Sequence, residues 1–306
     1  MDKPTAVHDT FIRAILADKE IAVDYFRTAL PAYIVERLDF STLTQLPDTY
    51  ISKELRKTVS DIVYSCSLKD GSGTIKISLL IEHKSYIDKY TSVQVGAYIF
   101  SGLLKQIGNK EKKLSLIIPI LLYHGREKWE YRTLSDLFED LDPELRQFIP
   151  DYEYIYHNLG EISDEAIQAL HNKFLAASFL ALKYSQIKDK LERWIPTILT
   201  LALEDSRNLQ NNLIIYTFGS SGLKEDRILA IVKELPRKIK DTVMSTLDIF
   251  VEKGRKEGHL KGRQEEREKA VRNMIHEEFE TGVICKILEV TPEYVVRIRK
   301  EMESGK

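Results

Sequence analysis

The chain has 306 residues, of which 43% are hydrophobic and 30% are charged, and its formal net charge at pH 7 is −2. This composition is typical of a soluble globular protein that is long enough for one sizeable core and a second domain. A net charge so close to zero excludes a strongly basic field around the whole molecule, so any contact with nucleic acid must come from a local patch.

Residues 8–36 are predicted to be helical, because apolar side chains recur there at helical spacing. These side chains are Phe11, Ile15, Ala22, Phe26 and Leu30. Pro31 marks a break or the start of a new helix. The pair His8 and Asp9 has two interpretations: it caps the first helical turn, or it is a catalytic pair close to an active site.

Residues 60–82 predict a β-hairpin. The segments "SDIVYSCSL" and "TIKISLLIE" have the composition of strands, and "KDGSG" between them contains Asp-Gly and a second glycine, as turns do. If Lys69–Gly73 forms the loop, residues whose numbers sum to about 142 face each other, because loop length sets the register of a hairpin. Asp61 is then expected near Ile81 and Glu82, at one end of the sheet.

Residues 91–106 predict a helix with an apolar stripe formed by Val93, Ala97, Phe100 and Leu104. Residues 114–123, "LSLIIPILLY", predict a buried strand, although Pro119 indicates that this strand lies at a sheet edge or contains a bulge. Helix, hairpin, helix and strand therefore follow each other in the first part of the chain, which indicates the α/β class.

Residues 162–250 predict helices with broad apolar faces, for which we expect bundle-like packing without chemistry of its own. After Val251, Gly254, Gly258 and Gly262 recur among dense charges of both signs. One interpretation is a mobile linker, because each interior glycine costs a helix roughly 1 kcal/mol. The other is a helix with its glycines along one face. The predicted domains are thus 1–160, 161–250 and 251–306.

The segment "VICKILEVTPEYVVRIRKEM" predicts helix, turn, helix. Thr291 is a residue type that commonly caps the N-terminus of a helix, and Pro292 is suited to the first helical position. The size fits a helix-turn-helix unit that reads DNA. It fits equally a short helical hairpin that packs on the chain or joins copies of it into a homo-oligomer.

Glu82 and Lys84 share one face of the second hairpin strand if that strand continues so far, because side chains alternate along a strand. Asp61 comes from the paired strand, so two carboxylates and an ammonium are expected at one end of the sheet. Carboxylates bind Mg²⁺ or Mn²⁺, which polarises a phosphate and activates water, and a lysine stabilises the developing charge. The alternative is a set of ordinary salt bridges.

The stretches "HDTFIRAIL", "DYFRTALPAYIVERLDFSTL", "SDIVYSC", "LLIEHKS", "QVGAYIF" and "IPILLYHGREKW" follow one another within residues 8–130. In this order they resemble the Rpn family of recombination-promoting nucleases and transposases, within the PD-(D/E)xK nuclease superfamily. The resemblance implies a nuclease-like core with a mixed sheet flanked by helices, followed here by a mostly helical C-terminal region. It also implies a metal-dependent DNA endonuclease.

The resemblance assigns roles to individual residues. Asp61 and Glu82 match the acidic metal ligands, the carbonyl of His83 matches a backbone ligand, and Lys84 matches the lysine of the E-x-K motif. Gln94 and Tyr98 match a polar position and a tyrosine that the family carries on the following helix, and we place Gln94 with the catalytic residues and Tyr98 with the DNA contacts. Two departures are Ser60 where the superfamily has proline, and lysine where many relatives have glutamine.

The expected activity is phosphodiester hydrolysis in DNA with low sequence specificity, linked to recombination or mobile elements. Basic side chains near the site are expected to hold the DNA backbone: Lys53, Arg56, Lys57, Lys89 and the group Lys110–Lys113. Two alternatives are a non-catalytic DNA-binding or regulatory protein that keeps the nuclease fold, and a transposase that transfers strands.

A cytoplasmic location without membrane attachment is also expected. The first residues, "MDKPTAVHDTF", lack a basic segment followed by an apolar one, and no apolar run reaches 18 residues. Cys66 and Cys285 have no CxxC spacing, which argues against a zinc site or a disulfide framework and suits a reducing compartment.

Overall fold

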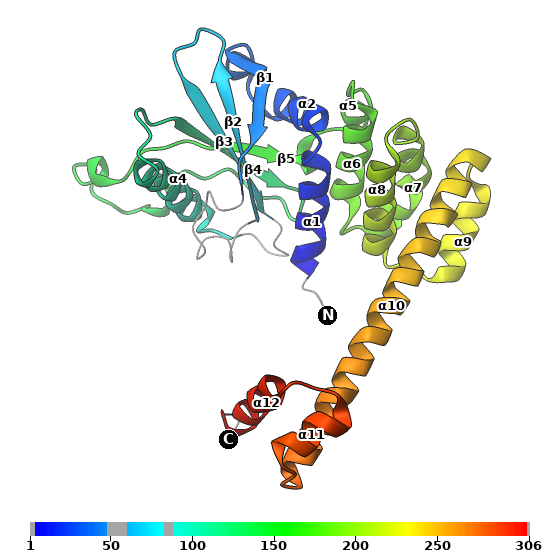
Figure 1. Cartoon of the computed structure of the whole chain (residues 1–306). Helices are drawn as coiled ribbons and strands as arrows, with labels where there is room; N and C mark the ends of the chain where they lie inside the picture. Colours follow the sequence, from blue (N-terminus) through cyan, green and yellow to red (C-terminus); the bar gives the residue numbers. More distant parts are fainter. Residues whose placement is uncertain (1–3, 48–59, 83–87, 305–306) are drawn as a thin grey trace. The chain divides into compact units, whose positions relative to one another are not determined.

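The computed structural model describes residues 4–47, 60–82 and 88–304, and at a few positions in these ranges, including Asp61 and Glu82, it describes the backbone alone. The chain divides into two compact units, Met1–Val243 and Met244–Lys306 (Figure 1). The region 161–250 was predicted to be a helical region packed on the core, and its residues up to Val243 belong to the same unit as the sheet. None of the described helices is long and apolar enough to cross a membrane.

The first unit is built on a sheet of five described strands in the order β1-β2-β3-β4-β5 (Figure 1). Strands β1, β2 and β3 pair antiparallel, whereas β3–β4 and β4–β5 pair parallel. Helices flank this mixed sheet, so the predicted α/β class is confirmed. The strands are β1 (Leu38–Gln45), β2 (Ser60–Leu68), β3 (Thr74–Glu82), β4 (Leu116–Tyr123) and β5 (Ile155–Asn158).

The predicted helical segment at the start of the chain forms consecutive helices. The Asp18 carboxylate accepts backbone N–H groups at the start of the second, and Pro31 precedes the third. The helices are α1 (Pro4–Leu16), α2 (Lys19–Ala29), α3 (Ala32–Val35), α4 (Thr91–Gly108), α5 (Asp164–Gln168), α6 (Lys173–Tyr184), α7 (Lys188–Leu201), α8 (Arg207–Ser221), α9 (Glu225–Glu234), α10 (Arg237–His276), α11 (Thr281–Leu288) and α12 (Pro292–Ser304). Short 3-10 helices are Ser135–Leu137, Arg146–Phe148 and Leu159–Glu161.

The predicted hairpin is confirmed as β2 and β3, but its register differs by one residue from the expected one. Leu68 donates its backbone N–H to the carbonyl of Gly73 at 2.9 Å, so the loop is one residue shorter than assumed. Gly71 in this loop has φ of +71°, a left-handed conformation that glycine adopts without strain. Asp61 consequently faces Leu80 and not Ile81.

The prediction that Pro119 places its strand at the edge of the sheet is wrong, because β4 lies between β3 and β5. The register explains why the proline is tolerated. Pro119 faces Ser78 on β3, whereas β5 pairs with β4 only from Ile120 onward. At Pro119 the strand therefore pairs with β3 alone among the described strands, so the proline interrupts no pairing with β5.

The sheet separates two apolar clusters. On one face, Ile62, Tyr64 and Ile77 pack with helices α1, α2 and α6, and α7 and α8 extend this cluster. On the other face, which α4 covers, the cluster is smaller and rich in aromatic side chains. It consists of Val63, Val95, Tyr98, Leu121, Tyr123, Trp129 and Tyr154.

The apolar stripe that the sequence shows on α4 is turned away from the sheet. Val93, Phe100 and Leu104 are 47%, 51% and 67% exposed. The helix faces the sheet instead with small and polar residues and two larger side chains: Thr91, Ser92, Val95, Gly96, Tyr98, Gly102 and Gln106. Near the C-terminal end of α4, the side-chain amide of Gln106 accepts a hydrogen bond from the backbone N–H of Ser115 and donates one to its carbonyl. Ser115 directly precedes β4.

Gly96 brings α4 against the loop before β5. A Cβ atom at this position would lie 2.5 Å from the hydroxyl of Tyr152. That hydroxyl donates a hydrogen bond to the backbone carbonyl of Ser92, in the first turn of α4. The absent side chain of Gly96 therefore leaves room for the tyrosine that holds the N-terminal turn of the helix.

The charged segment with three glycines, in the second unit, is helical. The structure thus supports the interpretation as a helix and not the interpretation as a mobile linker. Gly254, Gly258 and Gly262 all lie inside α10. The predicted cap of the last helix is confirmed, since the Thr291 hydroxyl accepts the N–H of Tyr294 at 3.3 Å. A small apolar cluster of Val271, Ile284, Val295 and Ile298 holds α10, α11 and α12 together.

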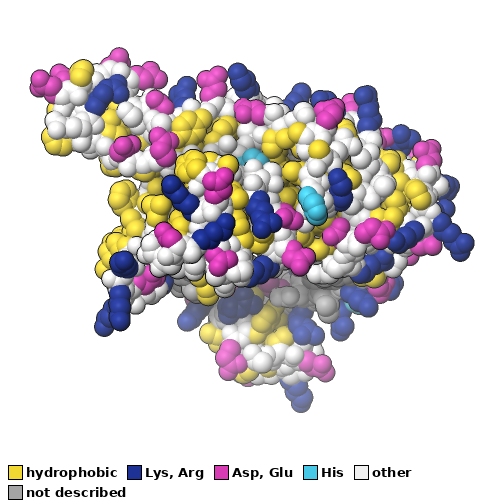
Figure 2. All heavy atoms as spheres, turned by 90° about the horizontal axis from the view of Figure 1, so that it is seen from above, with side chains coloured by type: hydrophobic (Ala, Val, Ile, Leu, Met, Phe, Trp, Pro, Cys, Tyr) yellow, Lys and Arg dark blue, Asp and Glu magenta, His cyan; other side chains and the backbone are white. Residues whose placement is uncertain are grey.

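Charges of both signs are interspersed over the face of the molecule in Figure 2, without a region of one sign. This distribution agrees with the near-zero net charge of the whole chain.

Exchanging Gly96 for alanine should destabilise the first unit by about 1 kcal/mol, because overpacking and the loss of the Tyr152 hydrogen bond outweigh the gain in helix propensity. The matched control is Gly219→Ala in α8, where a Cβ meets nothing within 4 Å. That variant should be stabilised by up to about 1 kcal/mol. Urea unfolding measures both changes, and equal shifts in the same direction would contradict the role given to Gly96.

His157 on β5 should make the fold sensitive to acid. Its ring is 8% exposed, packs against Tyr25 and Phe179, and burial lowers its pKa to about 4. In the unfolded chain the imidazole has its ordinary pKa near 6.5, so between these values the unfolded state binds more protons. Stability should therefore fall as the pH falls from 6.5 to 4, by up to about 3 kcal/mol.

The variant His157→Gln should lack this component of the acid sensitivity. The measurement is the free energy of unfolding in urea at pH 7 and pH 4.5 for both proteins. If the two lose the same stability between these pH values, His157 is not the group that titrates.

Candidate functional site

The backbone places the two predicted metal ligands on one face of the sheet. Asp61 faces Leu80 in the antiparallel pair, and Leu80 and Glu82 share a face because residues alternate along β3. Asp61 and Glu82 are thus diagonal neighbours on adjacent strands, an arrangement with a typical separation of about 7–8 Å. On β4, Leu121 and Tyr123 face Leu80 and Glu82, so this is the face that α4 covers.

Several predicted residues lie outside the described ranges. They are Lys53, Arg56, Lys57, His83 and Lys84. The lysine of the E-x-K motif, the backbone ligand and three of the DNA contacts therefore stay predictions. Among the side chains that are described, no three His, Cys, Asp or Glu lie close enough together to hold a metal ion.

The donor set at the predicted site nevertheless fits a divalent cation. Asp61 and Glu82 both supply carboxylate oxygens, which are the ligands that Mg²⁺ and Mn²⁺ prefer. A soft or imidazole-binding metal would require thiolates or histidines, and Asp61 and Glu82 supply neither.

Gln94 is fixed at the start of α4. Its amide donates to the carboxylate of Asp88 at 2.9 Å, and this carboxylate also accepts the N–H of Tyr90. The Asp88 carbonyl accepts both the N–H and the hydroxyl of Thr91. Asp88 therefore organises the first turn of α4 and the side chain of Gln94 together.

The other predicted contacts have different environments. Tyr98 is 3% exposed and packs with Val63 and Val95 between α4 and the sheet, as a core residue does. Lys89 is exposed, with its ammonium 4.7 Å from the ring centre of Tyr90. The bases Lys110–Lys113 follow the C-terminal end of α4, at the opposite end of this helix from Asp88.

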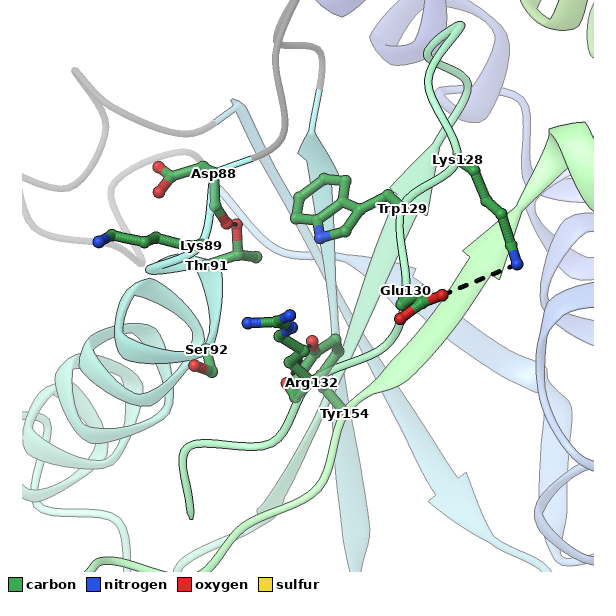
Figure 3. A pocket seen from close by; sticks show the side chains of 9 residues that line it. All are labelled: Asp88, Lys89, Thr91, Ser92, Lys128, Trp129, Glu130, Arg132 and Tyr154. Atoms are coloured by element: carbon green, nitrogen blue, oxygen red, sulfur yellow. Dashed lines mark hydrogen bonds and ion pairs between the residues drawn. The ribbon is translucent and has the colours of Figure 1, made fainter. Parts of the chain in front are cut away.

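A pocket of about 230 Å³ opens beside the N-terminal turn of α4 (Figure 3). It is lined by Asp88, Lys89, Thr91, Ser92, Lys128, Trp129, Glu130, Arg132 and Tyr154. The Trp129 ring lies edge-to-face on Tyr123, with 4.9 Å between ring centres. Because Tyr123 faces Glu82 across the β3–β4 pair, the pocket adjoins the predicted metal site.

The walls of the pocket are held by tyrosine hydroxyls that bond to backbone carbonyls. Tyr154 donates to Arg132 at 2.8 Å, and Tyr156 donates to Trp129 at 2.7 Å. Burial raises the pKa of Tyr154 to about 12, so its hydroxyl stays protonated and remains a donor. At Gly125 a Cβ atom would overlap the ring of Tyr123, whose hydroxyl donates to the carbonyl of Glu127.

His8, for which the sequence left a helix cap and a catalytic pair open, is an interior residue, and so is His124. His8 is 8% exposed, and its Nδ1 lies 2.6 Å from the hydroxyl of Tyr216. His124 directly follows β4, is 1% exposed, and its ring centre is 5.1 Å from that of His8. The pair joins α1 to the end of β4, where Glu82 also lies on the adjacent strand.

Sequence reasoning did not find the pocket, because its walls come from segments without a recognisable motif. Trp129 and Arg132 belong to an irregular segment between β4 and β5, and β5 itself was not predicted. A usable signal was the pair Asp88 and Thr91, since an aspartate just before a helix commonly organises its first turn.

Comparison with known proteins gives a consistent family. Residues 6–212 match the family described as "Putative transposase, YhgA-like". The inactive recombination-promoting nuclease-like protein RpnE of Escherichia coli K12 is 22% identical over 287 residues, which cover 93% of this chain and 94% of the relative. The recombination-promoting nuclease RpnA of the same strain is 25% identical over 251 residues, 81% of this chain and 84% of the relative.

The recombination-promoting nuclease RpnD of Escherichia coli O157:H7 is 23% identical over 233 residues, which cover 76% of this chain and 88% of the relative. No solved structure gives a significant match to the chain. The family match covers more than half of the sequence and includes the whole sheet with α4, so the resemblance predicted from the sequence is confirmed. This chain belongs to the YhgA-like family of Rpn-related proteins.

Proposed function

We propose that this protein is a metal-dependent DNA endonuclease that hydrolyses phosphodiester bonds. The observation that carries the proposal is the β2–β3 register, which puts Asp61 and Glu82 on one face of the sheet, beside a pocket with cationic side chains. Two relatives that span most of the chain are named recombination-promoting nucleases, which supports the same activity and a link to recombination or mobile elements.

In this mechanism Asp61, Glu82 and the carbonyl of His83 would hold Mg²⁺ or Mn²⁺. A bound cation of this kind polarises the scissile phosphate and lowers the pKa of a water molecule. Lys84 stabilises the charge that develops on the phosphate oxygens. Gln94, which Asp88 holds at the start of α4, orients the attacking water.

The proposed specificity for DNA sequence is low. The net charge of the chain is −2, so contacts with DNA are expected from a few basic side chains around the site, such as the exposed Lys89. Contacts between basic side chains of the protein and DNA phosphates carry no sequence information, and they weaken as the salt concentration rises.

A second candidate function is binding without catalysis. One relative matched over 93% of this chain is named an inactive nuclease-like protein. In that case the fold would be retained for DNA binding or regulation. The C-terminal helices would then join copies of the chain into a homo-oligomer. A transposase that transfers strands would use the same metal chemistry and is distinguished by joined DNA products.

The variants Asp61→Asn and Glu82→Gln should abolish cleavage of supercoiled plasmid, because each loses a charged metal ligand without a large change in volume. Wild-type cleavage should require Mg²⁺ and stop with EDTA. The matched control is Asp70→Asn in the loop of the same hairpin, at the far end from the site, which should cleave as the wild type does.

Full cleavage by either variant would refute the ligand assignment. A wild-type protein that binds the plasmid but does not cut it in Mg²⁺ or Mn²⁺ would favour binding without catalysis.

Lys84→Ala should slow the initial nicking rate by about 10²–10³-fold, the loss seen when one preorganised stabilising group is removed. Lys84→Gln should retain more activity, because glutamine keeps hydrogen-bond donors without the charge. The melting temperature of both variants should stay close to that of the wild type if Lys84 acts in the reaction, and it is measured beside the rate. Equal nicking rates for all three proteins would remove Lys84 from the mechanism.

A further inference from the structure

The pocket at the start of α4 presents hydrogen-bond donors that have no partner among the residues that the structure describes. The Trp129 side chain is 5% exposed, and its indole N–H makes no hydrogen bond among the described residues. In Figure 3 the indole nitrogen faces the interior of the pocket, on the side of Arg132. An N–H group that faces a pocket can donate a hydrogen bond to a ligand that enters it, so this N–H is suited to a ligand that accepts a hydrogen bond.

A second unpartnered group lies in the same wall. Ser92 is 2% exposed, and its hydroxyl has no hydrogen-bond partner in the described part of the chain. Ser92 belongs to the first turn of α4, a helix of 18 residues that no side chain caps. The first backbone N–H groups of a helix point outward and carry partial positive charge, which favours anions.

The charged side chains around the pocket favour an anion at its centre. The guanidinium of Arg132 extends into the space between α4 and Trp129, and it makes no ion pair among the described residues (Figure 3). Lys128 and Glu130 pair with each other at 3.7 Å and point away. The Asp88 carboxylate accepts hydrogen bonds from Gln94 and Tyr90 and is directed away from the centre.

The geometry points to a binding site for a backbone phosphate of the DNA strand that is cleaved, next to the scissile phosphate. This inference rests on the proposed function. Arg132, the Trp129 indole and the Ser92 hydroxyl can all donate hydrogen bonds, and a phosphodiester is an anion that only accepts them. The site adjoins the predicted metal ligands through Tyr123, which contacts Trp129 and faces Glu82.

A phosphate anchor at this place has a defined effect on the reaction. It holds the strand at one phosphate while the neighbouring phosphodiester lies at Asp61 and Glu82, so the scissile bond is positioned without reading bases. An inorganic phosphate or the terminal phosphate of a nucleotide has similar acceptor oxygens. The experiment therefore has to separate a DNA backbone from a free phosphate.

The chain contains two tryptophans, Trp129 and Trp194, so their indole N–H resonances can be followed individually by NMR on ¹⁵N-labelled protein. The variant Trp194→Phe assigns the signal of Trp129. The probes, added in EDTA so that no cleavage occurs, are a short single-stranded DNA, the same sequence with uncharged methylphosphonate linkages, and inorganic phosphate. We expect the DNA to shift the Trp129 indole proton at concentrations at which the other two do not.

An unmoved Trp129 indole proton on addition of DNA would overturn the proposal. An equal shift with inorganic phosphate or with the methylphosphonate strand would overturn it too, because the first indicates a free-phosphate site and the second a base-binding site. Since the titration needs no cleavage, its result does not depend on the nuclease activity, which the plasmid assay tests separately.

Binding by variants gives a second, independent measurement. Binding of the DNA is measured in EDTA with protein that also carries Glu82→Gln, so that no cleavage occurs. Arg132→Gln and Trp129→Phe should each weaken this binding, and the loss of the arginine charge should weaken it by about 10-fold. Arg132→Gln should also reduce the salt dependence by the equivalent of about one phosphate contact. The matched control is Arg193→Gln, an exposed arginine on α7 that lies outside the pocket. Unchanged affinity and salt dependence for Arg132→Gln would refute the anchor.

Discussion

The register of the β2–β3 pair is the constraint on which the arrangement of this site depends. A sheet has only two faces, and a shift of one residue in the pairing moves a residue from one to the other. The observed pairing of Asp61 with Leu80 puts Asp61 on the face of Glu82. The register expected from the sequence, with Asp61 opposite Ile81, would have put the two carboxylates on opposite faces. The length of the loop between Leu68 and Gly73 therefore decides whether Asp61 and Glu82 share a face of the sheet.

The two faces of the sheet have different tasks. Helices α1, α2, α6, α7 and α8 bury the large apolar cluster on one face and supply most of the hydrophobic stabilisation. The other face carries the predicted ligands and is covered by α4 and an aromatic cluster. Tyrosine hydroxyls there bond to backbone carbonyls of irregular segments, which fixes segments that have no ladder of their own.

Much of the fold could be predicted from the sequence because it follows from local patterns. Helical spacing gave the first helices, and strand composition with Asp-Gly gave the hairpin. Strands β1 and β5 were missed, since "LDFSTLTQ" is half polar and "IYHN" is short. The orientation of α4 was not predictable from periodicity, because its apolar stripe at Val93, Phe100 and Leu104 is exposed. For the site, Asp61, Glu82 and Gln94 stay predictions from the sequence, whereas the pocket depends on tertiary contacts of Trp129 and Arg132 and could not be predicted.

The inward face of α4 has a consequence for the shape of the pocket. Gly96 leaves room for the ring of Tyr152, whose hydroxyl bonds to the carbonyl of Ser92 in the first turn of α4. A side chain at position 96 would push this tyrosine or the helix aside, and the first turn of α4 forms one wall of the pocket. A residue that offers a ligand no side chain therefore contributes to the shape of the pocket through its small volume.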